Sequence, residues 1–154
     1  MEISGNVDAY ANRVRSALVA GVGLAGSGAF VADELPMSGI PDWLSRTNSL
    51  SGEQSGRPFD AAEGVRRYIE HREEDAWPLD EWLWGFEPGV RQWSWWDLTA
   101  AGANVVQIWV DSRSEPVFQC EDIRWIAYLA GARAVVGPIL LPSQVWIGQT
   151  TLGA

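Results

Sequence analysis

Apolar positions recur at helical spacing in two segments of the N-terminal half of the chain. This period predicts one amphipathic helix from about residue 7 to the glycines that begin at Gly21, and a second over about 60–74. The apolar positions are Val7, Tyr10, Ala11, Val14, Ala17 and Leu18 in the first segment, and Ala62, Val65, Tyr68 and Ile69 in the second. Polar residues occupy the opposite face of each segment.

A third helix is predicted over 121–130. It begins with two acidic residues, Glu121 and Asp122, where the helix dipole favours negative charge, and it stops at Gly131. Almost no polar face remains between these ends, so we expect this helix to be buried in the core.

Aromatic and β-branched residues dominate the second half of the chain and favour strands. The predicted strands are 81–86, 92–99, 104–111 and 115–118, with a hairpin turn at 111–114 joining the last two, and candidate strands at 29–35, 134–141 and 144–149. Residues 47–58 are rich in Ser and Gly and predict an exposed loop. The sequence therefore predicts an α+β fold, a single domain with a mainly antiparallel sheet and about three helices.

Charge narrows the classes of partner. The 154 residues include 20 acidic and 11 basic ones, for a formal net charge of −9 and a pI of about 4.5. The negative electrostatic field of such a protein repels phosphate backbones and anionic membrane surfaces, so we expect neither nucleic acid nor membrane as a partner. Every basic residue is Arg, which excludes a lysine nucleophile or Schiff base.

The single cysteine, Cys120, allows no disulfide within the chain, and we expect a cytoplasmic protein. The apolar stretch 17–30 resembles a signal-peptide core, but glycine dilutes it and acidic residues precede it, so we assign it to the fold.

Three short motifs suggest chemistry, and each has a simpler interpretation. Residues 21–26 fit G-x-G-x-x-G, yet they follow a predicted helix instead of a strand. His71 and Glu74 lie one helical turn apart and could share a metal. However, a structural zinc site needs four protein ligands, usually including Cys or more than one His, and this segment offers one His and carboxylates only. Cys120 stands at a helix start, where its pairing with His71 stays an open alternative to an inert buried thiol. We therefore expect no metal, no cofactor and no catalytic residues, leaving enzymatic activity open but disfavoured.

Tryptophan gives the strongest local signal, since six of the ten lie within residues 77–96. Most should fill the core, but a domain of this size seldom buries them all, so at least one or two should be partly exposed. Acidic residues crowd the same region. The candidate interface comprises Trp77, Trp82, Trp84, Trp93, Trp95, Trp96, Glu81, Glu87 and Asp97.

These features together favour a non-catalytic acidic protein that binds a basic protein partner. An immunity-type inhibitor of a bacterial toxin or nuclease is the concrete form, because a nuclease must be cationic and opposite charge accelerates association. The short length and the hairpin-then-helix pattern of residues 104–132 are similar to small bacterial immunity proteins in general, and abundant Ala, Gly and Arg suggest a high-GC bacterium. The alternatives are an enzyme or small-ligand binder with a Trp-lined pocket, and an oligomeric assembly subunit.

Overall fold

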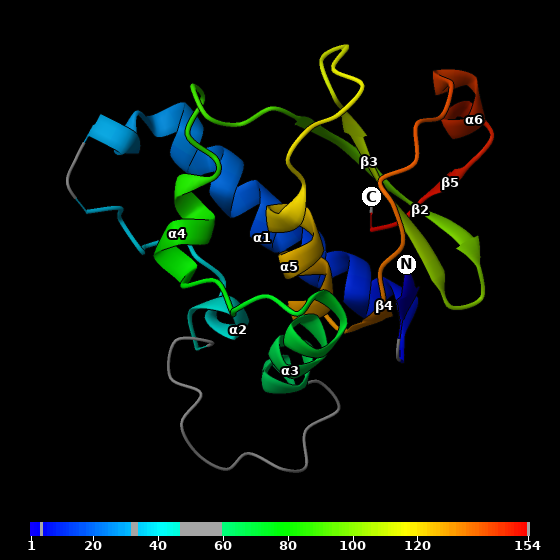
Figure 1. Cartoon of the computed structure of the whole chain (residues 1–154), viewed down its shortest axis with the longest axis horizontal. Coiled ribbons are helices and arrows are strands. Elements are labelled where there is room, and N and C mark those ends of the chain that lie inside the picture. The colour runs from blue at the N-terminus through cyan, green and yellow to red at the C-terminus, as the bar shows by residue number, and fades with distance from the viewer. Residues whose placement is uncertain (4, 32–33, 47–59, 154) are drawn as a thin grey trace.

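The computed structural model describes residues 1–3, 5–31, 34–46 and 60–153, and the whole of the loop predicted at 47–58 lies outside these ranges. It confirms the α+β class (Figure 1). In the described residues the helices are α1 (Val7–Ser27), α2 (Asp42–Ser45), α3 (Ala61–Arg72), α4 (Leu79–Trp84), α5 (Glu121–Leu129) and α6 (Ser143–Ile147), with a 3-10 turn η1 (Ala29–Val31). The strands are β1 (Glu2–Ile3), β2 (Ser94–Gly102), β3 (Val105–Asp111), β4 (Ala132–Ala134) and β5 (Thr150–Thr151).

The sheet is antiparallel, as predicted, with strand order β4-β1-β3-β2-β5. Its main unit is the long β2–β3 hairpin, which turns at residues 103–104 and pairs Ser94 with Asp111 at its far end. The hairpin predicted at 111–114 is therefore wrong. The chain after β3 forms an irregular connection to α5, since Pro116 lacks the amide that a ladder would use.

Helix α5 occupies the centre of the core, as its apolar sequence predicts, with six of its nine residues buried. It packs against α3, while α1 passes behind it in Figure 1. Gly64 of α3 is buried at the crossing, where only a residue without a side chain lets the two helices approach this closely. Tyr68 and Trp125 meet edge to face beside it, at 5.0 Å between ring centroids.

Helix α1 continues six residues beyond Gly21, so the predicted end of the first helix is wrong. Gly21 is buried against the ring of Phe86, and the left-handed Gly28 (φ 70°) ends the helix instead. The G-x-G-x-x-G match at 21–26 thus lies inside a helix and forms no strand-to-helix turn. Residues 29–31, predicted to begin a strand, form η1.

Two further strands are wrong because the segments are short helices. Residues 81–86 lie mostly in α4, which follows Pro78 and carries Asp80 and Glu81 in its first turn. Residues 144–149 lie mostly in α6, which follows Pro142. Of the candidate strand 134–141, only its first residue belongs to a strand, because the Gly137-Pro138 pair interrupts regular pairing.

Candidate functional site

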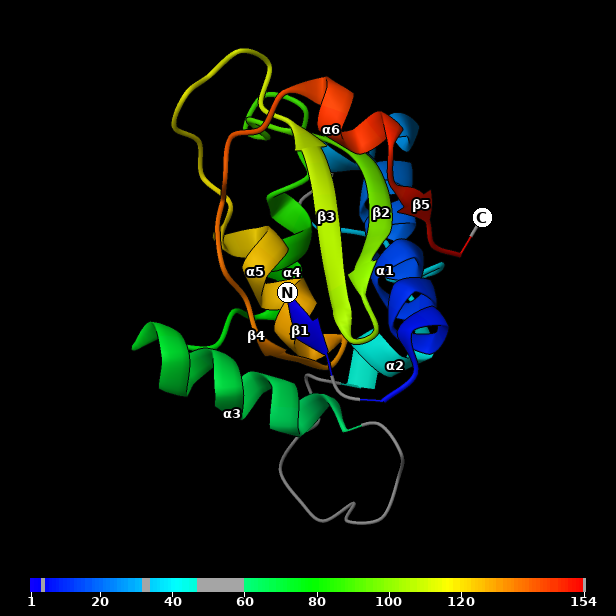
Figure 2. The ribbon, with the colours of Figure 1, turned by 90° about the vertical axis from the view of Figure 1, so that its right-hand side faces the viewer.

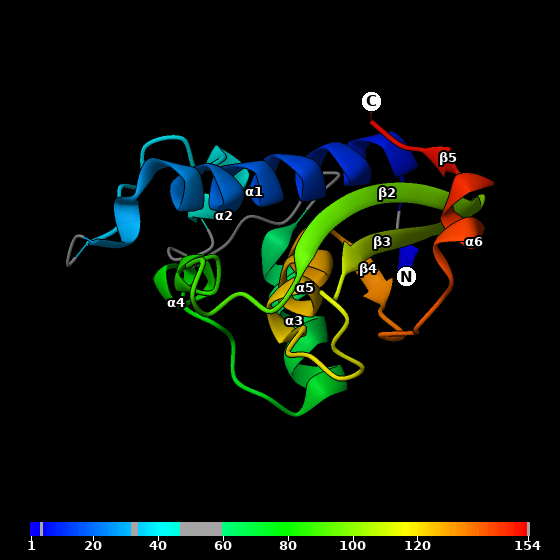
Figure 3. The same cartoon turned by 90° about the horizontal axis from the view of Figure 1, so that it is seen from above.

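An apolar groove of about 260 Å³ lies between β3 and the extended segment 135–141, which we call the strap. Figure 2 shows the strap, in orange, running past β3 on its way from β4 to α6. Helix α5 and the 112–118 connection complete the walls. Apart from Met1, the groove is therefore built from four segments that follow one another along residues 106–141. Helix α1 lies on the other side of β2 and β3 from the strap in Figure 3.

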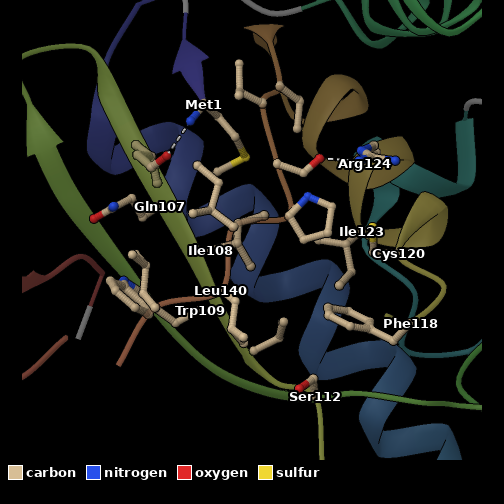
Figure 4. A pocket seen from close by; sticks show the side chains of 18 of the residues that line it. Met1, Gln107, Ile108, Trp109, Ser112, Phe118, Cys120, Ile123, Arg124 and Leu140 are labelled. Carbon is tan, nitrogen blue, oxygen red and sulfur yellow. Dashed lines mark hydrogen bonds between the residues drawn. The ribbon is translucent and has the colours of Figure 1, made fainter. Parts of the chain in front are cut away.

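Aliphatic and aromatic side chains line most of the groove. Ile108 of β3, Ile123 of α5 and Phe118 surround it together with Leu140 of the strap (Figure 4). Gln107 and Trp109 lie on the other side of the β3 ribbon, as strand alternation requires. The interior of the groove thus offers apolar contact with few polar groups to orient a reactant.

The strap leaves large apolar side chains in water. Val136 is 77% exposed, Ile139 68% and Leu140 79%. Ile147 of α6 and Val117 of the 112–118 connection are also exposed, at 72% and 85%. Exposed apolar side chains along one wall of a concavity, as in the strap, are typical of a protein interaction site.

Hydrogen bonds from α5 fix the first half of the strap. The Tyr128 hydroxyl accepts a hydrogen bond from the Val135 amide at 3.2 Å, and the Arg124 guanidinium donates to the carbonyl of Gly137. Arg124 is also paired with Glu121 of the same helix. The groove therefore keeps its width without any hydrogen bond between the strap and β3 among the described residues.

The acidic end of α3 is joined to this same region. His71 Nδ1 lies 3.0 Å from the Tyr128 hydroxyl, and Arg72 pairs with Glu121 at 3.0 Å. Tyr128 and Glu121 thus connect the C-terminal turn of α3 to the residues that hold the strap. Exposed carboxylates follow in close succession there, at Glu70, Glu73, Glu74 and Asp75.

The groove does not bring together an acid and a base for catalysis. Its lining holds one carboxylate, Glu115, and one guanidinium, Arg124, which is already engaged by Glu121 and Gly137. Burial raises the pKa of the Cys120 thiol, which also lines the groove. Among the hydrogen bonds of the described residues, His71 contacts Tyr128 and none joins Cys120 to His71. No cluster of metal-binding side chains occurs in the described part of the chain.

The structure does not assemble the nine predicted interface residues into one surface. Trp82 and Trp93 are buried in the core, where their indole N–H groups donate to Asp122, at 2.9 Å each. Trp84 and Trp96 are 37% and 44% exposed, which confirms that one or two indoles reach the surface. The remaining residues are the half-buried Trp77, Trp95 and Glu87 and the exposed Glu81.

Asp97, the last of the nine, is 5% exposed and so cannot meet a partner directly. Its carboxylate accepts hydrogen bonds from Arg15 (2.9 Å), Trp146 (2.9 Å) and Thr151 (2.7 Å). Burial alone would raise its pKa, but these bonds and one from the Leu98 amide outweigh burial and lower it. Asp97 therefore anchors α1, α6 and β5 to β2.

The pKa of Asp122 is shifted in the opposite direction from that of Asp97. Burial raises its pKa from the ordinary 3.8 to about 6, although the Ile123 amide and the Trp93 indole donate to its carboxylate. No cation is paired with it among the ion pairs of the described residues. Its carboxylate accepts from the Trp93 indole and its backbone carbonyl accepts from the Trp82 indole, so Asp122 belongs to the core.

Sequence reasoning missed the strap residues Val136, Ile139 and Leu140. The available signal was an apolar run, 135–141, that a Gly-Pro pair interrupts in the middle. Such a run cannot continue a strand ladder, so its side chains are free to face solvent.

The chain matches no family model, no curated protein and no solved structure in comparisons with known proteins. None of the helices in the described residues has the combined length and apolarity that crossing a membrane requires.

Proposed function

We propose that the protein is a non-catalytic acidic binding protein that engages a basic protein partner through the strap, the groove and the acidic end of α3. The observation that carries this proposal is the exposed apolar strap beside a concave groove. The acidic end of α3 adjoins the strap, since His71 at that end and the Val135 amide both contact the Tyr128 hydroxyl. An apolar centre with a charged periphery is the usual anatomy of a protein interface.

The groove itself favours a binding role over the small-ligand alternative. Its volume of about 260 Å³ lies below the range of roughly 300–1,000 Å³ typical of small-molecule sites, and one of its walls is an exposed segment. The few titratable groups in it are buried, paired or isolated, which supports binding without catalysis.

The concrete form of the proposal is a cytoplasmic inhibitor of the immunity type, whose partner is a basic toxin or nuclease. A net charge of −9 steers a cationic partner toward the protein and raises the association rate. The apolar strap then supplies contacts that slow dissociation. Steering acts through screened charge, so it weakens as ionic strength rises.

The test is affinity capture from a lysate of the source cell with this chain as bait, followed by an inhibition assay. The captured protein is identified, purified and assayed for its own activity with and without the bait. We expect to capture a protein of high pI whose binding to the bait weakens as salt is added. Its own activity should fall when the bait is added at a stoichiometric ratio. A neutral or acidic partner, or a basic one whose activity is unchanged, would contradict the proposal.

Two pairs of variants place the binding surface. Ile139→Ser with Leu140→Ser removes apolar contact from the strap, and its matched control is Val31→Ser with Val90→Ser, which are also exposed. We expect the strap variant to weaken binding about tenfold or more, which is about 1.4 kcal/mol, and the control to bind normally. Equal binding by both variants would exclude the strap.

The second pair tests the charged periphery. Glu70→Gln with Glu73→Gln is compared with Asp8→Asn with Glu34→Gln, an equal change of net charge at exposed positions outside the acidic end of α3. The first should lower the association rate more than the second at low salt, and the difference should vanish at high salt. Equal association rates for the two variants would show that only the net charge of the protein matters. The end of α3 would then lie outside the interface.

A further inference from the structure

The groove lies along an unpaired edge of the sheet. Strand β3 has seven residues, but its neighbour β1 has only two and reaches no further along β3 than Val106. Beyond that point, the groove lies between β3 and the strap. Figure 2 shows β1 ending low on β3 while β3 continues upward beside the strap.

Alternation of the backbone shows which groups face this groove. The Val106 amide donates to the Met1 carbonyl, and the Val106 carbonyl accepts from the Met1 amine, so both groups of Val106 point toward β1. In a strand every second residue presents its amide and carbonyl to the same side. Ile108 and Val110 therefore present theirs to the groove, whereas Gln107 and Trp109 pair with Thr99 and Asp97 of β2.

No partner for these groove-facing groups exists among the described residues. Neither the backbone ladder nor any side chain supplies a hydrogen bond to the outward amide or carbonyl of Ile108 or Val110. An unpaired strand edge is a template on which another strand can pair. Proteins therefore usually protect such edges with a covering segment, a charged side chain, a proline or a bulge. Here the strap passes alongside without pairing.

We propose that the groove accepts an extended segment of the protein partner, which adds to the sheet as a strand beside Ile108 and Val110. This inference rests on the proposed function and specifies how the partner is recognised. The backbone of the incoming segment would bond to β3, and alternate side chains would enter the apolar interior formed with Ile123 and Phe118.

The length and direction of the groove define the segment. From Val106 to the end of β3 there is room for roughly five residues, since a strand rises about 3.4 Å per residue. A segment that continues the line of β1 runs antiparallel to β3, so its N-terminal end lies at the Ser112–Glu115 end of the groove. The Glu115 carboxylate there takes part in none of the ion pairs of the described residues. A basic residue at the N-terminal end of the segment complements it.

The probe for the first experiment is a display library of linear peptides selected on the purified full chain. We expect selected peptides in which apolar residues alternate and a Lys or Arg precedes them. Amide hydrogen exchange, followed by NMR, then reports the contact directly. Bound peptide should slow exchange about tenfold or more at Ile108 and Val110, while Gln107 and Trp109, already bonded to β2, serve as controls within the same strand.

Methylation of the peptide tests backbone pairing without altering the protein. N-methyl groups on the amides that face β3 should weaken binding about tenfold or more, and methyl groups moved by one residue should have a much smaller effect. Glu115→Gln should weaken binding of a lysine-bearing peptide a few-fold, with Glu2→Gln, an exposed carboxylate of β1 outside the groove lining, as the matched control. Equal effects of the two methylation registers would overturn strand addition.

Two other outcomes would also overturn the inference. Protection of Ile108 and Val110 that grows with the concentration of the protein alone would assign the edge to a second copy of this chain. Unchanged exchange at both amides in the presence of an inhibited basic partner would refute strand addition while leaving the proposed function intact. Conversely, edge protection by the selected peptides, together with a capture experiment that yields no basic partner, would refute the proposed function and leave strand addition intact.

Discussion

Substitution of Gly64 by Ala tests the central packing contact of the fold. A Cβ at this position would lie 2.3 Å from the carbonyl oxygen of Tyr128 and 2.8 Å from the Cα of Leu129. Both are backbone atoms of α5, so no side chain can rotate away and the two helices must separate. Such overpacking costs about 1–3 kcal/mol or more, which exceeds the gain of about 1 kcal/mol in helix propensity from Gly to Ala.

We therefore expect Gly64→Ala to lower the free energy of unfolding by roughly 2 kcal/mol, and Tm by about 4–8 °C for a domain of this size. The control is Gly23→Ala in α1, where a Cβ would meet nothing within 4 Å. This control should gain up to about 1 kcal/mol from helix propensity. Urea and thermal unfolding, followed by tryptophan fluorescence and circular dichroism, measure both variants.

A Gly64→Ala protein as stable as the wild type, with an unchanged denaturant slope, would refute the close approach of α3 and α5. The same variant also bears on the groove. Separation of the helices moves Tyr128, whose hydroxyl joins His71 to the amide of Val135. Partner binding should therefore weaken in Gly64→Ala even at temperatures where the protein stays folded.

Two further predictions concern buried carboxylates. Asp122 should titrate with a midpoint near its pKa of about 6 when its carboxyl carbon is followed by NMR, and a midpoint near 4 would contradict its burial. Because its folded pKa is raised above the ordinary 3.8, its contribution to stability falls as pH rises from about 4 to 6. Asp97→Asn should cost roughly 3 kcal/mol at neutral pH, since it leaves the guanidinium of Arg15 without its ion-pair partner. The loss should shrink in acid, as the lowered pKa of Asp97 requires, and equal stability in urea unfolding at neutral pH would show that the carboxylate anchors nothing.

The helices that sequence predicts correctly are those with a clear polar face or clear ends. Helix α3 follows Asp60, whose side chain accepts from the Ala62 amide, and α5 begins with two acids, so their boundaries lie within about two residues of the prediction. The prediction ended the first helix too early, at Gly21, because glycine lowers helix propensity. Burial of Gly21 against Phe86 overrides that local cost, and no local pattern shows such a contact.

Aromatic-rich segments were harder to interpret because bulky side chains suit both strands and buried helical turns. Residues 81–86 have the composition of a strand, yet Trp82 and Phe86 lie one helical turn apart and meet edge to face at 4.8 Å. Proline at residue 78, with two acids after it, was the local sign of a helix start. The tryptophans therefore marked the core more than the surface.

The candidate site could not be located from sequence because it depends on the lengths of segments that meet only in the fold. Strand β1 joins β4 to β3, and it does so only at the beginning of β3. With two residues, β1 joins the sheet at one end and leaves the edge of β3 unpaired at the other. The strap must then cross this opening, and the Arg124 and Tyr128 contacts hold it without occupying the edge. An edge kept open in this way is the part of the surface that a partner strand can complete.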